Sequence, residues 1–565
     1  MRRVWMAVLP LFLALVALVF VLGQGQTLTV TVLAINDLHG ALLPQNFSVP
    51  DPNDRSRRVS IQAGGVEALA TLVKEMRARN PHTVFVGAGD LIGATPLISA
   101  LLADEPTIMA LNRMGMAVSA LGNHEFDKGL KELQRIQRGG CQEAYDPSRA
   151  CRLGTYEGAR FPYIAANVLD RATGRPLFPP YVVQRVGGVE VAFVGAVLRG
   201  TPSIVPPSGI AGLDFTDEAE AINRVIPEIR ARGVEAIVAL VHEGGFAREP
   251  FDEPNCTSLS GPIVDIVRRL DRAVDVVVSG HTHRGYLCRV DGRLVTQADA
   301  NGRLLTQIDL SIDPRTRDVV AARAANLVVD AARLAKDPEM TALVNQARAI
   351  ADPIANQPVA RLAVEQIRRE ASPAGESALG NLIADAQLAA TRDPAKGGAV
   401  VAFMNPGGIR ADLPPNPSPN RTVTYGDLFT VQPFGNTLVV MTLTGTQIRA
   451  LLEQQFDNPE PGRNRILQVS QGFSYTWDAR RPKGERVLSI RLNGQELLPD
   501  GRYRVTVNSF LAEGGDNFTV LREGTERVGG PLDLDALQAY LQAMEAAGRP
   551  AGSLLENRIS AVNLP

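Results

Sequence analysis

Five of the six histidines of this chain lie beside Asp, Asn or Gly directly after short apolar runs. They are His39 in VTVLAINDLHG, His124 in VSALGNHEFD, His242 in EAIVALVHEGG, and His281 and His283 in VDVVVSGHTH. Each run has the length and composition of a buried strand that ends at a glycine-rich bend, so polar groups from several strands gather at one edge of a sheet. Imidazole and carboxylate groups in this arrangement predict a divalent metal centre.

Seven side chains supply a ligand set large enough for two cations. They are Asp37, His39, Asp90, Asn123, His242, His281 and His283. One carboxylate, most naturally Asp90 in VFVGAGDLIG, can bridge two cations roughly 3.5–4 Å apart. Such cations lower the pKa of water from about 15.7 toward 7 and bind phosphoryl oxygens, which predicts phosphate-ester chemistry. A single motif of this kind is usually turn chemistry, whereas five in one domain favour a metal site. His82 lacks such neighbours and is interpreted as a surface or structural residue.

Composition limits the class of protein. The chain has 565 residues, of which 45% are hydrophobic, so it is globular and long enough for two large domains. Its net charge of −2 and pI near 6.4 argue against a nucleic-acid polymer as the main partner, because phosphate backbones require a basic surface. Oligomeric state is not determined by these properties.

The N-terminus has the layout of a secretory signal over residues 1–23. Arg2 and Arg3 precede an uncharged run that ends near Gly23, a possible cleavage position. The alternative is a retained single-span anchor, because the run approaches the length needed to cross a bilayer. Both interpretations predict an exported chain, periplasmic or on the cell surface, and no other stretch is long and apolar enough to span a membrane after signal removal.

The four cysteines are consistent with export to an oxidising compartment. Cys141 and Cys151 are ten residues apart. Cys256 lies before the GHTH motif and Cys288 lies after it. Two local disulfides are the simplest prediction. Free thiols or thiolate metal ligands remain as alternatives, although no C-x-x-C spacing occurs.

The chain divides into two parts with different patterning. Residues 27–326 alternate strand-like and helical segments, which predicts a layered α/β domain. Residues 327–355 are expected to form a helical linker, because residues 330–351 lack strand patterning and are typical of a helix or helix pair that ends before Pro353. Residues 356–565 mix helices and strands and are expected to form a second, α+β domain.

The motifs NDLHG, GAGD, GNHEFD, HEG and GHTH resemble the signature of the calcineurin-like metallophosphoesterases. More closely, the chain resembles exported bacterial 5′-nucleotidases, including those that hydrolyse UDP-sugars or 2′,3′-cyclic nucleotides. The resemblance implies that one metal is held by Asp37, His39, Asp90 and His283, and the other by Asp90, Asn123, His242 and His281. The mixed nitrogen and oxygen ligands suit Zn, Mn, Co or Fe.

The same resemblance implies roles for His124 and Asp127 of the GNHEFD motif. In the family, the histidine contacts the phosphoryl group and the aspartate orients the imidazole. A carboxylate-paired imidazolium can stabilise the transition state and assist the leaving oxygen. The alternative is that Asp127 caps the helix that follows.

In the second part of the chain, Arg410 follows a glycine turn and can form charge-assisted bonds to phosphate or ribose. Phe434 and Phe510 lie in loops and could stack on a planar base, although loop anchoring is the ordinary role of such residues. The family motifs N-x-G-G-I-R, P-F-G and N-x-F-L-x-x-G-G-D occur here in order. They imply that the two phenylalanines sandwich the base and that Asn405, Arg410 and Asp516 contact the nucleoside.

One stretch departs from the family pattern. Several relatives carry a further substrate-contacting arginine just before the helix that begins near Ala378, and residues 374–381 of this chain contain none. Arg368 and Arg369 are nearby candidates to replace it. The absence leaves the substrate range open between monophosphates, cyclic phosphates and diphosphate-linked sugars.

The sequence thus predicts an exported two-metal phosphohydrolase that releases phosphate from a nucleotide substrate. Alternatives in the same scaffold are a 2′,3′-cyclic nucleotide phosphodiesterase, a UDP-sugar diphosphatase or a thiosulfonate hydrolase. A protein of another class, a non-catalytic nucleotide-binding surface protein, is the remaining alternative.

Overall fold

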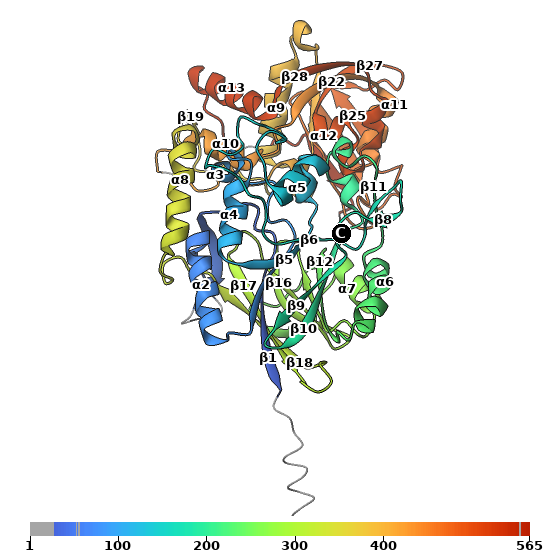
Figure 1. The fold of residues 1–565 in the computed structure, drawn as a ribbon. Helices are drawn as coiled ribbons and strands as arrows, with labels where there is room; N and C mark the ends of the chain where they lie inside the picture. The colour runs from blue at the N-terminus through green and yellow to red at the C-terminus, as the bar shows by residue number, and fades with distance from the viewer. Residues whose placement is uncertain (1–26, 52–53, 55–56, 418, 553–554, 565) are drawn as a thin grey trace, which may run out of the picture.

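The computed structural model describes residues 27–564 except 52, 53, 55, 56, 418, 553 and 554. The predicted signal over residues 1–23 lies outside the described residues. Within the described part of the chain, no helix combines the length and apolarity required to cross a membrane. Figure 1 shows the N-terminal half below and the C-terminal half above it.

The first sheet of the N-terminal half has six strands in the order β18-β17-β1-β4-β5-β6. Their bounds are β1 (Leu28–Ile35), β4 (Thr83–Ala88), β5 (Met116–Ala120), β6 (Tyr163–Ile164), β17 (Leu304–Ile312) and β18 (Val319–Val328). Strands β1, β4, β5 and β6 run parallel, and β17 is antiparallel to β1. The parallel strands therefore place their carboxyl ends at one edge of the sheet.

The second sheet has seven strands in the order β13-β15-β16-β14-β12-β10-β9. Their bounds are β9 (Tyr181–Val186), β10 (Val189–Val197), β12 (Ala236–His242), β13 (Pro254–Cys256), β14 (Val276–Ser279), β15 (Gly285–Val290) and β16 (Arg293–Ala298). Its central strands β10, β12, β14 and β16 are also parallel. Strands β10, β12 and β14 are nearly continuous apolar runs, as expected of strands buried on both faces.

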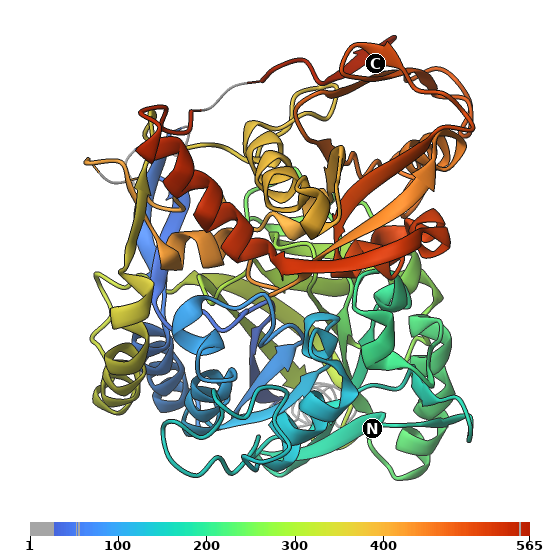
Figure 2. The same cartoon turned by 90° about the horizontal axis from the view of Figure 1, so that it is seen from above.

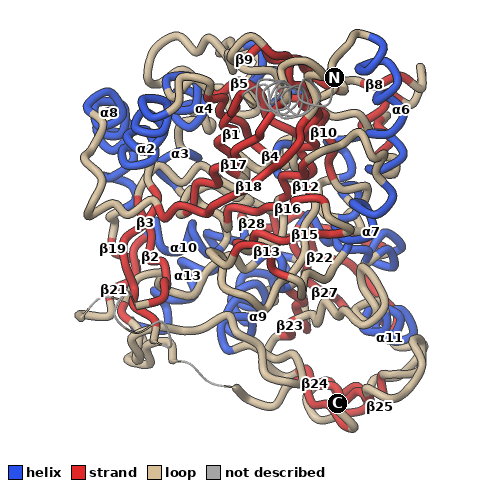
Figure 3. The backbone as a smooth tube through the Cα atoms, turned by 90° about the horizontal axis from the view of Figure 1, so that it is seen from below, coloured by secondary structure: helices blue, strands red, loops and turns tan. Residues whose placement is uncertain are grey.

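The two sheets pack face to face, and helices cover their outer faces. Fully buried side chains from both sheets form one core cluster, for example Val32, Val86 and Leu240. Helices α2 (Val66–Arg79), α4 (Glu105–Arg113) and α5 (Gly129–Arg138) cover the first sheet, and α6 (Glu218–Ala231) and α7 (Pro262–Arg269) cover the second. Figure 3 shows the strands between these two helical layers. This arrangement confirms the predicted layered α/β fold.

Short elements complete the N-terminal half. They are β2 (Pro44–Pro50), β3 (Arg58–Gly64), α3 (Leu97–Ala100), β7 (Val168–Asp170), β8 (Arg175–Pro176) and β11 (Leu213–Phe215). Disulfides join Cys141 to Cys151 and Cys256 to Cys288, as predicted.

The expected linker helix is α8 (Pro338–Ala355), which packs on the N-terminal core. The Asp337 side chain caps its first turn, and Met340 and Leu343 are fully buried in the cluster that also contains residues of α2. The expectation that this helix ends before Pro353 is wrong. A proline in the last turn removes one N–H donor only, and the Asn356 N–H still bonds to the Asp352 carbonyl, so the helix continues past it.

The C-terminal half contains two further sheets and confirms the predicted mixed α+β pattern. The larger has the order β23-β20-β27-β22-β28, and the smaller has the order β26-β25-β24-β29. The strands of the larger sheet are β20 (Val401–Met404), β22 (Thr437–Thr444), β23 (Gln468–Val469), β27 (Arg502–Asn508) and β28 (Thr525–Leu532). Those of the smaller are β24 (Phe473–Asp478), β25 (Val487–Leu492), β26 (Gln495–Glu496) and β29 (Ile559–Val562). A separate pair is β19 (Pro358–Arg361) and β21 (Thr422–Thr424).

The helices of this half are α9 (Ala378–Thr391), α10 (Tyr425–Val431), α11 (Gly445–Glu453), α12 (Ser509–Ala512) and α13 (Asp533–Ala546). Thr424 and Thr444 begin α10 and α11 with reciprocal capping boxes. Figure 2 shows α13 and β28 crossing over the N-terminal half. Leu97 and Ala100 of α3 are buried in the same cluster as residues of α9, α10 and α13, so the two halves share apolar contacts beside the functional site.

Candidate metal centre and substrate cavity

All seven predicted metal ligands lie at the carboxyl ends of parallel strands. Asp37 and His39 follow β1, Asp90 follows β4, Asn123 follows β5, and His242 ends β12; His281 and His283 follow β14. The two sheets face each other, so strand ends from both meet at one place. The structure therefore brings together residues separated by up to 246 positions, from Asp37 to His283.

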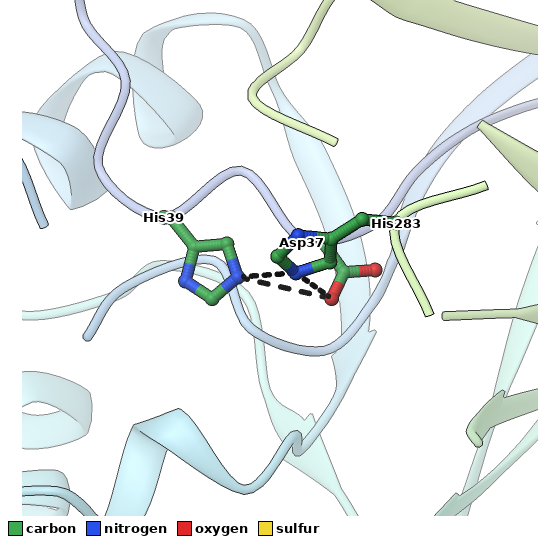
Figure 4. A group of neighbouring side chains, drawn as sticks. All are labelled: Asp37, His39 and His283. Atoms are coloured by element: carbon green, nitrogen blue, oxygen red, sulfur yellow. Dashed lines mark hydrogen bonds and ion pairs between the residues drawn. The ribbon is translucent and has the colours of Figure 1, made fainter. Parts of the chain in front are cut away.

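One group consists of Asp37, His39 and His283, whose candidate ligand atoms lie within 4.8 Å of one another. The Nε2 atoms of His39 and His283 are 3.0 Å apart, and His283 Nε2 is 3.3 Å from Asp37 Oδ1. Figure 4 shows both imidazoles pointing toward the same carboxylate oxygen.

A second group consists of Asp90, His242 and His281. His242 Nε2 lies 3.0 Å from Asp90 Oδ2, and His281 Nδ1 lies 3.1 Å from Asn123 Oδ1. Asp90 Oδ2 is also 3.8 Å from His39 Nε2 of the first group. Asp90 is therefore the carboxylate placed between the two groups.

The backbone hydrogen bonds of His39 and His242 use their Nδ1 atoms, which leaves their Nε2 atoms able to bind cations. His39 Nδ1 is 2.8 Å from the Gly93 carbonyl, and His242 Nδ1 is 2.8 Å from the Ala88 carbonyl. Each Nδ1 therefore donates to backbone, and each Nε2 presents its lone pair to the carboxylates. Among the described residues, the buried His242 Nε2 has no hydrogen-bond partner, although it lies 3.0 Å from Asp90 Oδ2. A buried imidazole nitrogen that faces a buried carboxylate oxygen can share a cation with it, so these residues fit a metal ion.

The protonation behaviour of these groups agrees with that fit. Burial lowers the pKa of His281 to about 3 and that of His39 well below its ordinary value, so both rings are neutral. Burial also lowers the pKa of His242, but the adjacent Asp90 carboxylate outweighs burial and raises it to about 10. The Asp90 carboxylate therefore favours a positive charge beside His242 Nε2.

The loops that carry the ligands are conformationally strained. Positive φ angles occur at Asp37, His39, Asp90, His281 and His283, between 46° and 70°. Non-glycine residues rarely adopt this region, and several such residues in one place mark a functional site. Gly122 is needed for a different reason, because a Cβ atom there would lie 2.1 Å from Asp90 Oδ1.

Glu125 is a supporting residue that the sequence reasoning missed, although it lies within the GNHEFD motif. Its buried carboxylate accepts hydrogen bonds from the N–H groups of Asp90, Leu91 and Gly122. It thereby ties the loop after β4 to the loop after β5, which carries Asn123.

His124 and Asp127 lie beside the metal centre. His124 Nδ1 is 2.8 Å from Asp127 Oδ2, and the His124 N–H donates to Asp90 Oδ1. Burial lowers the pKa of His124, but the Asp127 and Asp90 carboxylates outweigh burial and raise it above its ordinary value. Asp127 also accepts a hydrogen bond from the Ala94 N–H, so it contacts the neighbouring loop as well as the imidazole.

One cavity of about 390 Å³ joins this centre to the C-terminal half. Its lining includes Asn123, His124, Asp127 and His281 from the N-terminal half. All five predicted substrate-binding residues line it from the other side, namely Asn405, Arg410, Phe434, Phe510 and Asp516. A cavity of this size that combines charged side chains with apolar and aromatic ones suits a small molecule with a polar end and an apolar end.

Phe434 and Arg410 of the C-terminal half lie beside His124. The Phe434 ring stacks on the His124 ring, with centroids 5.9 Å apart, and the Arg410 guanidinium lies 5.8 Å from the Phe434 centroid. Burial, with the charge of Arg369, lowers the pKa of Arg410 from its ordinary value. The guanidinium remains charged, because arginine does not lose its proton in proteins.

Asp516 and Asn405 form the other end of the cavity. The Asn405 Nδ2 atom donates to Asp516 Oδ2 at 2.7 Å, and Arg465 lies 3.2 Å from Asp516 Oδ1. Sequence reasoning missed Arg465, because no motif distinguishes it from other surface arginines. Arg368 and Arg369 do not line the cavity. Arg369 instead donates to the Ile409 carbonyl next to Arg410.

Comparison with known proteins agrees with this geometry. Residues 30–285 match the calcineurin-like phosphoesterase family, and residues 355–523 match the 5′-nucleotidase C-terminal domain family. A crystal structure of a 5′-nucleotidase precursor from Thermus thermophilus is 30% identical and covers 95% of this chain and 100% of its own, with a TM-score of 0.77.

Two curated bacterial relatives are longer than this chain. Endonuclease YhcR of Bacillus subtilis is 34% identical over 94% of this chain, which spans 40% of that protein. Cell wall protein Lmo0130 of Listeria monocytogenes is 30% identical over 95% of this chain, which spans 70% of that protein. These similarities confirm the resemblance drawn from the motifs. The chain belongs to the calcineurin-like phosphoesterase family, in the branch that carries a 5′-nucleotidase C-terminal domain.

Proposed function

We propose that this protein is an exported, two-metal phosphohydrolase that removes phosphate from nucleotides. The single observation that carries the proposal is the shared cavity. Its lining joins His124 and His281 at the metal-binding end to Phe434, Phe510 and Asp516 at the far end. Such a cavity suits a substrate with a phosphate at one end and a planar base at the other.

The proposed ligands divide into two sets that share Asp90. Asp37, His39 and His283 would hold one divalent cation with it, and Asn123, His242 and His281 would hold the other. When bound there, divalent cations would supply Lewis-acid chemistry that makes water more acidic and offsets charge on phosphoryl oxygens. Zn, Mn, Co and Fe suit the mixed nitrogen and oxygen donors.

The protein groups around the phosphoryl position have complementary roles. His124, held by Asp127, donates a hydrogen bond to a phosphoryl oxygen and assists departure of the ester oxygen. Arg410 adds a positive charge on the side opposite the metal ligands. Because both groups lie within a largely buried cavity, their electrostatic effect is stronger than in water.

The far end of the cavity supplies the proposed nucleoside contacts. Phe434 and Phe510 stack on the base, each contributing on the order of 0.5–1.5 kcal/mol beyond burial. Asn405 and Asp516 contact the ribose. The preference for a base over a small aryl group therefore resides in the C-terminal half.

Export is supported by the two disulfides, which form in oxidising compartments, and by the secretory layout of residues 1–23. Periplasmic or cell-surface placement would give the protein access to extracellular nucleotides. N-terminal sequencing of the mature protein from fractionated cells tests this part of the proposal.

A second candidate is hydrolysis of the phosphodiester of a 2′,3′-cyclic nucleotide or of the phosphoanhydride bond of a diphosphate-linked sugar. It is favoured by similarity to an endonuclease and to the trifunctional nucleotide phosphoesterase YfkN of Bacillus subtilis, which is 28% identical over 95% of this chain. The missing arginine in residues 374–381 is a second reason to test it.

One experiment distinguishes these functions. Purified protein is assayed with AMP, UMP, ATP, a 2′,3′-cyclic nucleotide and UDP-glucose, with and without a chelator. The proposal expects chelator-sensitive release of phosphate, fastest from a nucleoside monophosphate. Faster turnover of the cyclic nucleotide or UDP-glucose would favour the second candidate, and absence of turnover with added metal would contradict both.

A further inference from the structure

Arg465 lines the cavity. It belongs neither to the proposed metal ligands nor to the family motifs, so its role is not yet assigned. Four basic residues line the cavity: Lys128, Arg149, Arg410 and Arg465. Lys128 pairs with Asp104, and Arg149 pairs with Asp146, both within the N-terminal half. Arg410 lies beside Phe434 at the phosphoryl end. Arg465 alone of these four pairs with Asp516 at the nucleoside end.

The Asp516 carboxylate is held from both sides. Its Oδ2 accepts a hydrogen bond from Asn405 Nδ2 at 2.7 Å, and its Oδ1 lies 3.2 Å from the Arg465 guanidinium. Asn405 is itself fixed, because its Oδ1 accepts a hydrogen bond from Asn508 Nδ2 at 3.0 Å. The carboxylate is 8% exposed and Arg465 is 21% exposed, so this pair is only weakly screened by solvent.

The backbone at Asp516 needs this support. Its φ angle of 55° lies in the left-handed region, which costs a non-glycine residue free energy. Asn458 compensates by donating from Nδ2 to the Asp516 carbonyl at 2.7 Å. Asn458 and Arg465 belong to one loop before β23, so a single segment holds both the backbone and the side chain of Asp516.

We propose that Arg465 is a positioning residue that fixes the Asp516 carboxylate to accept both hydroxyls of a ribose 2′,3′-diol. Among the residues that the structure describes, each Asp516 oxygen has one protein partner, which leaves a lone pair on each for a ligand hydroxyl. Two neighbouring acceptors held at fixed orientation match a vicinal diol, whereas a freely rotating carboxylate does not. Arg465 thus makes the site selective for ribonucleotides over 2′-deoxynucleotides. This inference rests on the proposed nucleotide hydrolysis.

The test compares Arg465→Ala and Arg465→Lys with the wild type, using AMP, 2′-deoxy-AMP and a small aryl phosphate. Arg481→Ala is the matched control, because Arg481 faces Asp478 on the surface of the same half, outside the cavity. We expect Arg465→Ala to raise KM for AMP about 10- to 100-fold with little change in kcat, the range for loss of a charge-assisted bond. The ratio of kcat/KM between AMP and 2′-deoxy-AMP should fall toward one.

The Arg465→Lys variant and the aryl phosphate distinguish a positioning role of Arg465 from a merely structural role. Arg465→Lys should restore part of the preference for AMP, since lysine keeps the charge but lacks the planar fork. Aryl phosphate hydrolysis by both variants should match that of Arg481→Ala. An unchanged AMP preference in Arg465→Ala would overturn the inference, and so would an equal loss with aryl phosphate, which would indicate a merely structural role. Wild-type protein that hydrolyses aryl phosphate but no nucleotide would instead overturn the proposed function.

Discussion

The imidazole of His124 and the phenyl ring of Phe434 are stacked across the cavity, with centroids 5.9 Å apart and an interplanar angle of 16°. His124 follows β5 of the N-terminal half, and Phe434 precedes β22 of the C-terminal half. The two halves therefore meet where the proposed phosphoryl contact lies beside one wall of the proposed base site. Hydrolysis and nucleoside recognition are expected to respond separately to substitutions on the two sides.

Replacement of His124 by Ala should lower kcat about 10²- to 10⁴-fold, the usual contribution of a general acid. The bound metal should stay at the wild-type level, because the other proposed ligands are intact. Steady-state kinetics with elemental analysis of the same sample measures both quantities. His82→Ala, a histidine outside the cavity, serves as the control. Equal loss of metal and activity in His124→Ala would assign the imidazole to the metals.

Combined replacement of Phe434 and Phe510 by Ala should raise KM for AMP by about one to two orders of magnitude, since two stacking contacts are removed. Hydrolysis of a small aryl phosphate should change little, because its phosphate still reaches the metal centre. The informative quantity is the ratio of kcat/KM for the two substrates. A ratio equal to that of the wild type would refute the base clamp.

Removal of His242 should reduce the metal content to about one cation per chain, because Asp37, His39 and His283 remain as a separate group. Asp90→Asn should reduce it further, because Asp90 lies between the two groups. Elemental analysis after gel filtration measures both. Two tightly bound cations in His242→Ala would contradict the proposed ligand sets.

Chelation of the wild type should lower its thermal unfolding midpoint, since ligands that bind only the folded state stabilise it.

The buried carboxyl of Asp533 predicts a pH dependence of stability. Burial raises its pKa to about 7, above its ordinary value of 3.8. The unfolded chain therefore releases this proton first, so the free energy of unfolding falls as pH rises from about 4 to 7 and then levels off. The total effect is on the order of 2–4 kcal/mol.

Asp533→Asn should remove this part of the pH dependence and stabilise the protein at pH 8. The amide oxygen can still accept the hydrogen bond that the Leu534 N–H donates to the carboxylate. Denaturant unfolding of both proteins at pH 5 and pH 8 makes the comparison. If the two proteins lose the same stability between these pH values, Asp533 is not the source.

The sequence alone determined the class of fold and the chemistry of the centre. Apolar runs such as β12 and β14 are local, and each is followed or ended by His at a glycine-containing bend, so their number and spacing already indicate a sheet edge carrying metal ligands. The two disulfide pairings are also local, at 10 and 32 residues. The end of α8 was predicted wrongly, because proline is a weak helix terminator in a last turn.

Only the tertiary structure decided how the parts meet. Nothing near Arg465 in the sequence points to Asp516, which is 51 positions away, and nothing near Phe434 points to His124, which is 310 positions away. These pairs form because loops from different sheets converge on one cavity, and such long-range contacts depend on the packing of whole domains. Local sequence patterns indicate which residues are buried and which lie in turns. Which residues contact one another across the cavity depends on the assembled fold.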